Sequence, residues 1–172
     1  LLDAEVDCSL STGEEEDFRP EDTHLAATAE KLDLKRHFDT AVIDECQMIA
    51  DPQRGYAWTR AILGVLSPEV HLCAAPEAKQ LLVRLIESCG DSVEVALHER
   101  ATPLLCMSHP IDYQRVQPGD ALITFSKIGV LSVAEDLRQS GKEPAIIYGA
   151  LPYATRRKQM EGFLAGEMEY IV

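Results

Sequence analysis

The stretch Ala41-Val42-Ile43-Asp44-Glu45-Cys46-Gln47 carries the strongest signal in this chain. An apolar run is followed at once by an acidic pair, so Asp44 and Glu45 are predicted at the carboxyl end of a buried strand. Open α/β sheets bind their ligands at that end of the strands. An aspartate there can hold Mg²⁺, and a following glutamate can orient or deprotonate an attacking water. The alternative is a solvated acidic turn.

Composition limits what the 172-residue chain can be. Its length allows one domain or two small ones, and its net charge of −13 argues against a broad basic surface for nucleic acid. A narrow cleft with backbone amides and a few basic groups stays compatible with that charge. No apolar run approaches the ~20 residues of a membrane span and no signal peptide is recognisable, so we expect no membrane partner. Because the sequence starts without methionine, we expect a fragment.

The five cysteines form no C-x-x-C pair. An odd number without such pairs predicts reduced, mostly buried thiols in a cytosol-like compartment. His71 and Cys73 are two residues apart on a predicted strand, so both side chains point to one face. They could share a metal, but no partner pair stands at ligand spacing, and we predict no zinc site.

Short apolar strands alternate with helical patterns along most of the chain. This alternation predicts an α/β fold of parallel sheets covered by helices on both faces. An acidic exposed loop is expected over 13–23, and an irregular, proline-containing segment over 98–119 is the candidate boundary between two similar units. The predicted strands are 40–43, 70–74, 93–97, 121–125, 145–148 and 169–172. Two helices are predicted over 56–66 and 153–164. A third begins at Pro76 and is capped by Gly90, and a fourth is lined by Val130 to Leu137 and ends at Gly141.

Four segments together resemble an ATP-dependent RNA helicase of superfamily two, of the mitochondrial degradosome type and its bacterial relatives. They are residues 41–60, 71–77, 121–127 and 145–152. The resemblance extends from about Ser9 to Val172, and residues 41–64 are its most specific part. It implies two RecA-like parallel-sheet units, both incomplete. Residues 1–97 would be the C-terminal part of the first helicase domain and residues 98–172 the N-terminal part of the second.

The resemblance also implies roles for individual residues, with ATP and Mg²⁺ as cofactors. Asp44 resembles the metal-linked aspartate of helicase motif II and Glu45 the catalytic glutamate beside it. Gln47 stands at the fourth position of that motif, and Ala74 lies in the stretch that resembles motif III, near the nucleotide. The residues that resemble nucleic-acid contacts are Thr12, Gly13 and Thr28 in the first unit, and Ser126, Lys127, Tyr148 and Gly149 in the second.

Each of these residues has a simpler interpretation. Thr28 could belong to a helix face, Ser126 could be a helix N-cap, and Lys127 could be a solvated surface charge. Gln47 could simply cap the strand end. Trp58 is predicted in the core rather than as a platform for base stacking. Arg54 and Arg60 lie in the family-like stretch, but the sequence suggests no mechanical role for them.

The chain also departs from the family pattern. A phosphate-binding G-x-x-x-x-G-K-[ST] loop is absent, and Ser140-Gly141-Lys142 is no substitute. The sequence stops where motifs V and VI would follow. We therefore expect the parent protein to be a helicase that hydrolyses ATP and this fragment alone to be inactive. The alternatives are a non-catalytic module that binds nucleic acid or protein, and a DNA helicase of the same superfamily.

The resemblance further implies a partner and a location. The partner would be RNA, either single-stranded or partly duplex, and DNA is not excluded. A ribonuclease or another RNA-processing protein would be a second partner. The location would be the bacterial cytoplasm, or the mitochondrial matrix if the source is eukaryotic.

Overall fold

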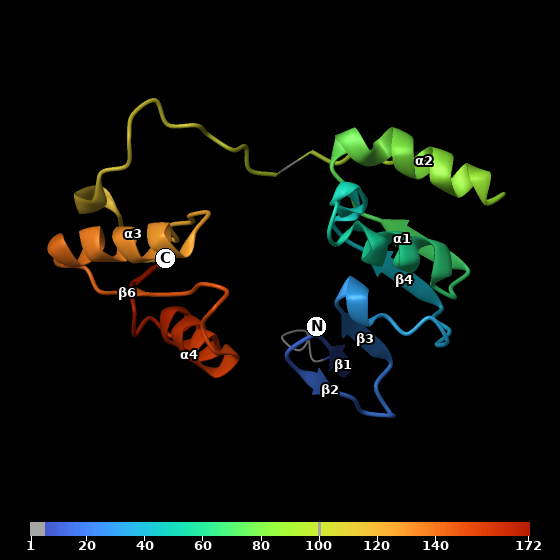
Figure 1. The fold of residues 1–172 in the computed structure, drawn as a ribbon, viewed down its shortest axis with the longest axis horizontal. Coiled ribbons are helices and arrows are strands. Elements are labelled where there is room, and N and C mark those ends of the chain that lie inside the picture. Colours follow the sequence, from blue (N-terminus) through green and yellow to red (C-terminus); the bar gives the residue numbers. More distant parts are fainter. Residues whose placement is uncertain (1–5, 100) are drawn as a thin grey trace. The chain divides into compact units, whose positions relative to one another are not determined.

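The computed structural model describes residues 6–99 and 101–172 (Figure 1). The chain divides into two compact units, Leu1–Glu99 (unit 1) and Arg100–Val172 (unit 2). The division falls in the irregular segment 98–119. The assignment of the units to parts of two helicase domains stays a prediction.

Within the described part of unit 1, the strands form two small sheets. In the first sheet β1 pairs antiparallel with β2 and parallel with β3, and in the second β4 pairs parallel with β5. Ile43 lies opposite Leu72, so the carboxyl ends of β4 and β5 meet at one edge. The strands are β1 (Cys8–Ser11), β2 (Glu16–Asp17), β3 (His24–Ala27), β4 (Thr40–Ile43) and β5 (Glu69–Leu72).

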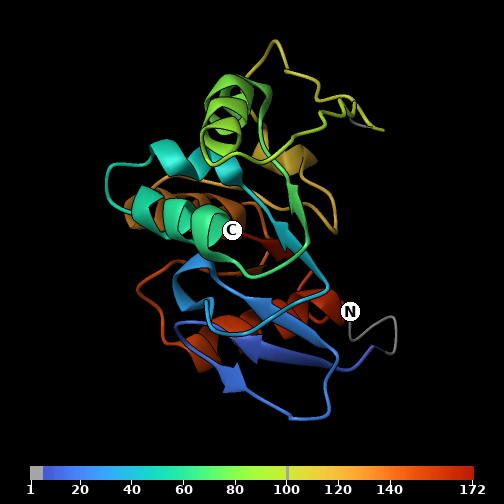
Figure 2. The same ribbon diagram turned by 90° about the vertical axis from the view of Figure 1, so that its right-hand side faces the viewer.

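Helix α1 (Gly55–Gly64) covers the second sheet of unit 1 (Figure 2). Its buried side chains Ala57, Trp58 and Ala61 recur at helical spacing and meet Ile43 of β4 in the hydrophobic core. Helix α2 adds Leu82 to the same core. The remaining helical elements of the unit are η2 (Ala29–Lys31), η3 (Cys46–Ala50), η4 (Pro76–Ala78) and α2 (Lys79–Ser88).

Unit 2 is built around the short parallel pair of β6 (Pro144–Ala145) and β7 (Tyr170–Ile171). Helices α3 (Lys127–Gln139) and α4 (Tyr153–Leu164) lie on opposite sides of β6 (Figure 1). The core collects residues from α3, β7 and the segment that contains the short helix η5 (Tyr113–Arg115). Its buried members are Val116, Leu122, Val130, Ala134, Leu137, Tyr170 and Val172.

The structure confirms most of the predicted elements. Strand 40–43 and helix 153–164 have the expected bounds, and Gly90 and Gly141 follow their helices with φ of 89° and 77°. These left-handed angles suit glycine, which has no Cβ to clash. None of the helices within 6–99 and 101–172 is long and apolar enough to cross a membrane.

Two predicted strands, 93–97 and 121–125, are absent from the part of the chain that the structure describes. In the second segment only Ala121 forms an isolated bridge, with Ile171. A strand requires a hydrogen-bonded neighbour along its length, and apolar side chains such as Leu97 and Phe125 stay exposed here. The alternating pattern describes the segment alone and carries no information about that neighbour.

Predictions about burial are also corrected. Residues 13–23 are not all an exposed loop, since β2 lies among them and Asp22 is buried, with its Oδ2 accepting a hydrogen bond from the Ser9 hydroxyl at 2.9 Å. The thiols are not mostly buried, because three of the five are exposed: Cys73, Cys89 and Cys106. On α4 the sequence places Met160, Phe163 and Leu164 on one predicted apolar face, but Met160 and Leu164 are exposed.

Candidate functional site

The acidic pair leaves the sheet at the carboxyl end of β4. The ladder continues past the strands, because the Cys73 N–H donates to the Ile43 carbonyl and the Cys46 N–H to the Cys73 carbonyl, each at 2.9 Å. Asp44 and Glu45 lie between these two hydrogen bonds in the chain, and both side chains are exposed. The sheet therefore holds the backbone on either side of the pair and leaves the carboxylates accessible.

Glu45 is the non-glycine residue with a positive φ among the described residues, with φ 55° and ψ 37°. Its N–H donates to Asp44 Oδ1 at 2.8 Å, and its carbonyl accepts from the Met48 N–H at 2.8 Å as η3 begins. A left-handed conformation is unfavourable for a side chain with a Cβ and persists only where the surroundings hold it. The left-handed backbone therefore points the Glu45 carboxylate in a direction that an extended backbone at the end of a strand would not give.

Cys46 anchors this turn in the core. Its side chain is fully buried, and the thiol donates to the Ile43 carbonyl at 3.1 Å. Burial raises the pKa of Cys46 to about 11, so the group stays a neutral thiol at physiological pH. Cys46 therefore packs as an apolar residue and supplies no nucleophile.

Gln47 links the acidic turn to the end of the neighbouring strand. Its amide Nε2 donates to Glu45 Oε2, and its Oε1 accepts from the Ala75 N–H at 3.1 Å. Ala75 follows Ala74, so the structure brings Asp44, Glu45, Gln47 and the predicted nucleotide neighbour Ala74 to one edge of the sheet. Gln47 thus does more than cap β4, because it joins the segments after β4 and β5.

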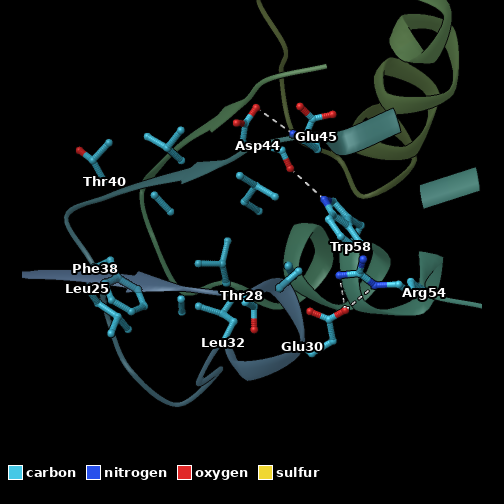
Figure 3. Close-up of a pocket in the computed structure, with 17 residues that line it drawn as sticks. Leu25, Thr28, Glu30, Leu32, Phe38, Thr40, Asp44, Glu45, Arg54 and Trp58 are labelled. Carbon is cyan, nitrogen blue, oxygen red and sulfur yellow. Dashed lines mark hydrogen bonds and ion pairs between the residues drawn. The ribbon is translucent and has the colours of Figure 1, made fainter. Parts of the chain in front are cut away.

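Trp58 of α1 holds the acidic turn from the side of the core. Only 8% of the residue is exposed, and its indole Nε1–H donates to the backbone carbonyl of Asp44 at 2.8 Å (Figure 3). The prediction of a core residue is confirmed, and a ring buried in this way offers no free face for base stacking.

The donor set of the turn suits a hard divalent cation. Among residues 6–99 and 101–172, no three or more His, Cys, Asp or Glu side chains gather in a metal-binding group. Mg²⁺ commonly takes one or two protein carboxylates and completes its octahedral shell with water and substrate phosphates. The exposed Asp44 carboxylate fits that mode of binding.

A hollow of about 400 Å³ extends from the acidic turn toward η2 (Figure 3). Its walls come largely from apolar side chains of β3, β4 and α1, such as Leu25, Ile43 and Ala61. Polar lining residues are Thr28, Glu30, Thr40, Asp44, Glu45 and Arg54. The hollow therefore places the acidic turn and the segment around Thr28 on one connected surface of unit 1.

The predicted nucleic-acid residues of unit 1 lie together at the carboxyl ends of parallel β1 and β3. Thr28 follows β3, and its N–H donates to the Ser11 carbonyl at 3.1 Å. Thr12 follows β1, and its hydroxyl oxygen accepts from the N–H groups of Glu14 and Glu15 at 3.2 and 2.9 Å. Thr12 therefore stabilises the turn that contains Gly13, and its role in binding stays a prediction.

The predicted residues of unit 2 also cluster. Lys127 Nζ lies 5.1 Å from the centre of the Tyr148 ring, and Gly149 follows with open space where a Cβ would be. Ser126 Oγ accepts from the Gly129 N–H at 3.0 Å, as expected of the helix N-cap of α3. The simpler interpretation of Ser126 is confirmed. Lys127 is exposed and Tyr148 is half-buried against the core of unit 2, and together they form a cation–aromatic pair that could meet a phosphate and a base.

The sequence pointed to no function for Arg54 and Glu30, which form an ion pair beside Trp58, with Arg54 Nη2 2.9 Å from Glu30 Oε1. The two residues are 24 positions apart, so no local pattern could have paired them. Arg60 donates to the Leu32 carbonyl at 3.0 Å, which gives it a structural role.

Comparison with known proteins gives one matching family model, the DEXQ-box helicase domain of Suv3, over residues 1–98. Asp44, Glu45 and Gln47 supply the D, E and Q of that description, and Cys46 stands at its variable position.

Curated relatives carry consistent names. The chain is 40% identical to the mitochondrial ATP-dependent RNA helicase SUV3 homolog of Caenorhabditis elegans, over 92% of this chain and 23% of the relative. It is 42% identical to the mitochondrial ATP-dependent RNA helicase SUPV3L1 of Mus musculus, over 93% of this chain and 21% of the relative. The chain thus spans about a fifth of the length of these proteins.

Among solved structures, a variant of S. cerevisiae Dbp5 bound to RNA and ADP–BeF3 matches with a TM-score of 0.62. The identity is 13%, and the match covers 96% of this chain and 50% of that chain. At this identity the likeness concerns the fold, and it supports the predicted RecA-like α/β class.

The names of the relatives overturn one prediction. A bacterial cytoplasmic location is contradicted, because the relatives from worm, mouse, human and rice are all named as mitochondrial proteins. The motifs that carry the resemblance concern ATP and RNA. Because this chemistry is the same in the bacterial cytoplasm and in mitochondria, the motifs do not distinguish the two locations.

Proposed function

Because the chain belongs to the family of Suv3 DEXQ-box helicases, we propose that it is part of an ATP-dependent RNA helicase. The protein would couple ATP hydrolysis to movement along RNA or to unwinding. One observation carries the proposal: the acidic pair stands at the carboxyl end of β4, and Gln47 ties Glu45 to the segment after β5. This is the edge of an open α/β sheet where ligand chemistry belongs.

Asp44 is the proposed ligand of Mg²⁺. The cation would neutralise negative charge on the ATP phosphates during transfer. Asp44 itself contributes an exposed carboxylate whose Oδ1 is oriented by the Glu45 N–H. Its backbone carbonyl also accepts a hydrogen bond from the Trp58 indole, so the position of the carboxylate depends on that contact.

Glu45 is the proposed group that orients the attacking water and accepts its proton. The left-handed backbone at Glu45 directs this carboxylate away from the strand, and the Gln47 amide donates to one of its oxygens. The other oxygen can accept from water. Because Gln47 also binds the backbone at Ala75, a shift of the segment after β5 would change the aim of Glu45.

RNA would contact Thr12, Gly13 and Thr28 in unit 1 and Ser126, Lys127, Tyr148 and Gly149 in unit 2. The clustering of these residues within each unit supports the proposal. Contacts with phosphate and sugar suit a motor that must accept any sequence. Units 1 and 2 would then be the C-terminal part of the first RecA-like domain and the N-terminal part of the second.

The names of the relatives support a mitochondrial location. A ribonuclease or another RNA-processing protein as a partner is proposed from the family resemblance alone.

Two substitutions in the full-length protein test the assigned roles. Glu45→Gln keeps the shape of the side chain and removes its basicity, so RNA-stimulated hydrolysis should fall by roughly 10²–10⁴-fold. Its ATP affinity should be nearly unchanged. Asp44→Asn should also weaken Mg²⁺-dependent ATP binding, because it removes a charged ligand. Phosphate release and fluorescent-nucleotide titration measure the two effects.

Glu69→Gln is the matched control, because Glu69 is an exposed carboxylate on β5 that pairs with His71 at 3.0 Å. It should leave both quantities at the wild-type level. Equal ATP affinities and equal residual rates for Asp44→Asn and Glu45→Gln would refute the division of roles. Stimulation by single-stranded DNA but not by RNA would refute the proposed substrate.

A further inference from the structure

Four residues from three segments of unit 1, namely η2, the start of α1 and the turn after β4, make consecutive contacts (Figure 3). Glu30 of η2 accepts from Arg54 at 2.9 and 3.0 Å. The Arg54 guanidinium lies 5.4 Å from the centre of the Trp58 ring, and the Trp58 indole donates to the Asp44 carbonyl. The contacts thus run without a gap from η2 to the acidic turn.

The first end of this series is attached to a predicted RNA contact. Thr28 immediately precedes η2 and is held on β1 by its hydrogen bond to Ser11. Glu30 is less exposed than Arg54, with 30% of its side chain accessible against 56%. Its own backbone amide and then Arg54 hold the pKa of Glu30 below the usual value, so the carboxylate is charged at neutral pH. A movement of Thr28 would carry Glu30 with it.

Arg54 is not required to start α1, which leaves its side chain available for another purpose. The helix entry is already stabilised by Asp51, whose Oδ1 accepts from the N–H groups of Gln53 and Arg54 at 2.9 and 2.7 Å. Gly55 supports the same entry, because a Cβ there would collide with the Ile49 carbonyl. The Arg54 side chain instead crosses to Glu30 and covers the ring of Trp58.

We propose that Glu30, Arg54 and Trp58 are positioning residues that couple the segment at Thr28 to the acidic turn. The inference rests on the proposed function, since it assigns RNA contact to Thr28 and catalysis to Glu45. RNA contact shifts η2, the ion pair passes the shift to the Trp58 ring, and the indole moves the backbone of Asp44. In this proposal the three residues act through Thr28 and Asp44 rather than through RNA or ATP directly, and they determine how strongly RNA stimulates hydrolysis.

The small free energy of the ion pair and the fixed geometry of the guanidinium favour coupling over simple stabilisation. An ion pair as exposed as this one changes a folding equilibrium by only about five-fold at most. A planar guanidinium that stacks on an aromatic ring and binds a carboxylate at its edge has a restricted orientation, so it transmits displacement better than a flexible ammonium. Energetic coupling between sites is typically carried by packed side chains and ion pairs of this kind.

The test uses the full-length protein and measures ATP hydrolysis without RNA and over a range of RNA concentrations. Glu30→Gln and Arg54→Gln should each lower the RNA-stimulated maximum by about three- to ten-fold. The rate without RNA and the RNA concentration for half-maximal stimulation should be unchanged. The double variant should be no worse than either single variant. Arg54→Lys should recover only part of the stimulation, because an ammonium keeps the charge but loses the planar contact with Glu30 and Trp58.

The structure offers a matched control in the neighbouring ion pair. Lys31 follows Glu30 in η2, and its Nζ lies 2.9 Å from Glu16 Oε1, but this pair makes no contact with Trp58 that the described structure records. Glu16→Gln should therefore keep full stimulation. Thermal unfolding of all variants separates loss of fold from loss of coupling, and Arg54→Lys preserves the charge if Arg54→Gln is unstable.

Each outcome decides a different claim. If wild-type hydrolysis does not respond to RNA, the proposed function itself is wrong. If RNA stimulates the wild type but the Glu30 and Arg54 variants behave like Glu16→Gln, the coupling is refuted. Equal losses with and without RNA, or additive losses in the double variant, would also refute it, because they indicate a purely structural contribution.

Discussion

Cys46 shows how one residue can belong to a functional motif and yet serve the fold. It lies between Glu45 and Gln47, but its side chain is fully buried and donates to the Ile43 carbonyl. Burial raises its pKa to about 11, above the value of 9.0 for an exposed thiol. The folded state therefore keeps the proton that the unfolded chain releases near pH 9.

This difference predicts a pH dependence of stability. The contribution of Cys46 is fully present below pH 9 and is lost as the pH rises toward about 11, because the folded state disfavours the thiolate. Cys46→Ala should remove that loss, so the free energy of unfolding should fall less steeply above pH 9 than in the wild type. Urea unfolding monitored by the fluorescence of Trp58, the one tryptophan of the sequence, measures it.

Cys89→Ala serves as the control because Cys89 is exposed. It should keep the wild-type slope with pH. Parallel profiles for all three proteins would contradict the assignment of the buried thiol.

The helices show which elements are encoded locally. Helix α3 begins at Lys127 after the N-cap Ser126 and ends before Gly141, which takes a left-handed φ of 77°. Helix α1 begins at Gly55, where a close backbone contact with Ile49 excludes a side chain. In both cases the residue type at the end of the helix meets a local need of the backbone. Ser126 supplies an acceptor for a free N–H group, and Gly141 and Gly55 avoid the clash that a Cβ would cause.

Ser126 allows the structural and binding roles of one residue to be separated. Ser126→Ala should destabilise unit 2 by about 1 kcal/mol, because the Gly129 N–H loses its acceptor. Ser126→Asp keeps an acceptor at the N-cap and adds a negative charge, so it should preserve stability and weaken RNA binding. Urea unfolding monitored by circular dichroism and RNA titration measure the two properties. If Ser126→Asp binds RNA as well as wild type, Ser126 does not lie at the RNA surface.

At the scale of the whole molecule, charge opposes the proposed ligand. The net charge is −13, and an acidic run at positions 14–17 follows Thr12 and Gly13. Attraction to RNA must come from local groups, of which the pair of exposed Lys127 and half-buried Tyr148 is the clearest in the described structure. Long-range repulsion is only partly screened at physiological salt.

We therefore expect this chain to bind single-stranded RNA weakly and without preference for sequence. Few phosphates are neutralised, so log affinity should depend shallowly on log salt, with a slope of about −0.7 for each contact. Lys127→Gln should reduce the slope by about one such contact, whereas Lys158→Gln on the exposed side of α4 should not change it. Fluorescence anisotropy at several salt concentrations measures the slope. Tight binding at physiological salt, or a marked preference for one sequence, would identify a dedicated recognition module instead.

The sequence by itself determined the features that depend on neighbouring residues. The position of Asp44 and Glu45 follows from the apolar run before them, and the helix 153–164 follows from its composition and flanking residues. Glycine after α2 and α3 marks a left-handed residue because its backbone conformation is a local property.

Only the tertiary structure decided the features that depend on distant partners. Segments 93–97 and 121–125 have strand-like patterns, but a strand forms only where a second segment supplies its hydrogen bonds. The left-handed backbone of Glu45 depends on the η3 turn and the core around Cys46. The Glu30–Arg54 pair brings together residues 24 positions apart. Periodicity reports which face of an element is apolar, whereas contacts between elements are set by how the whole core packs.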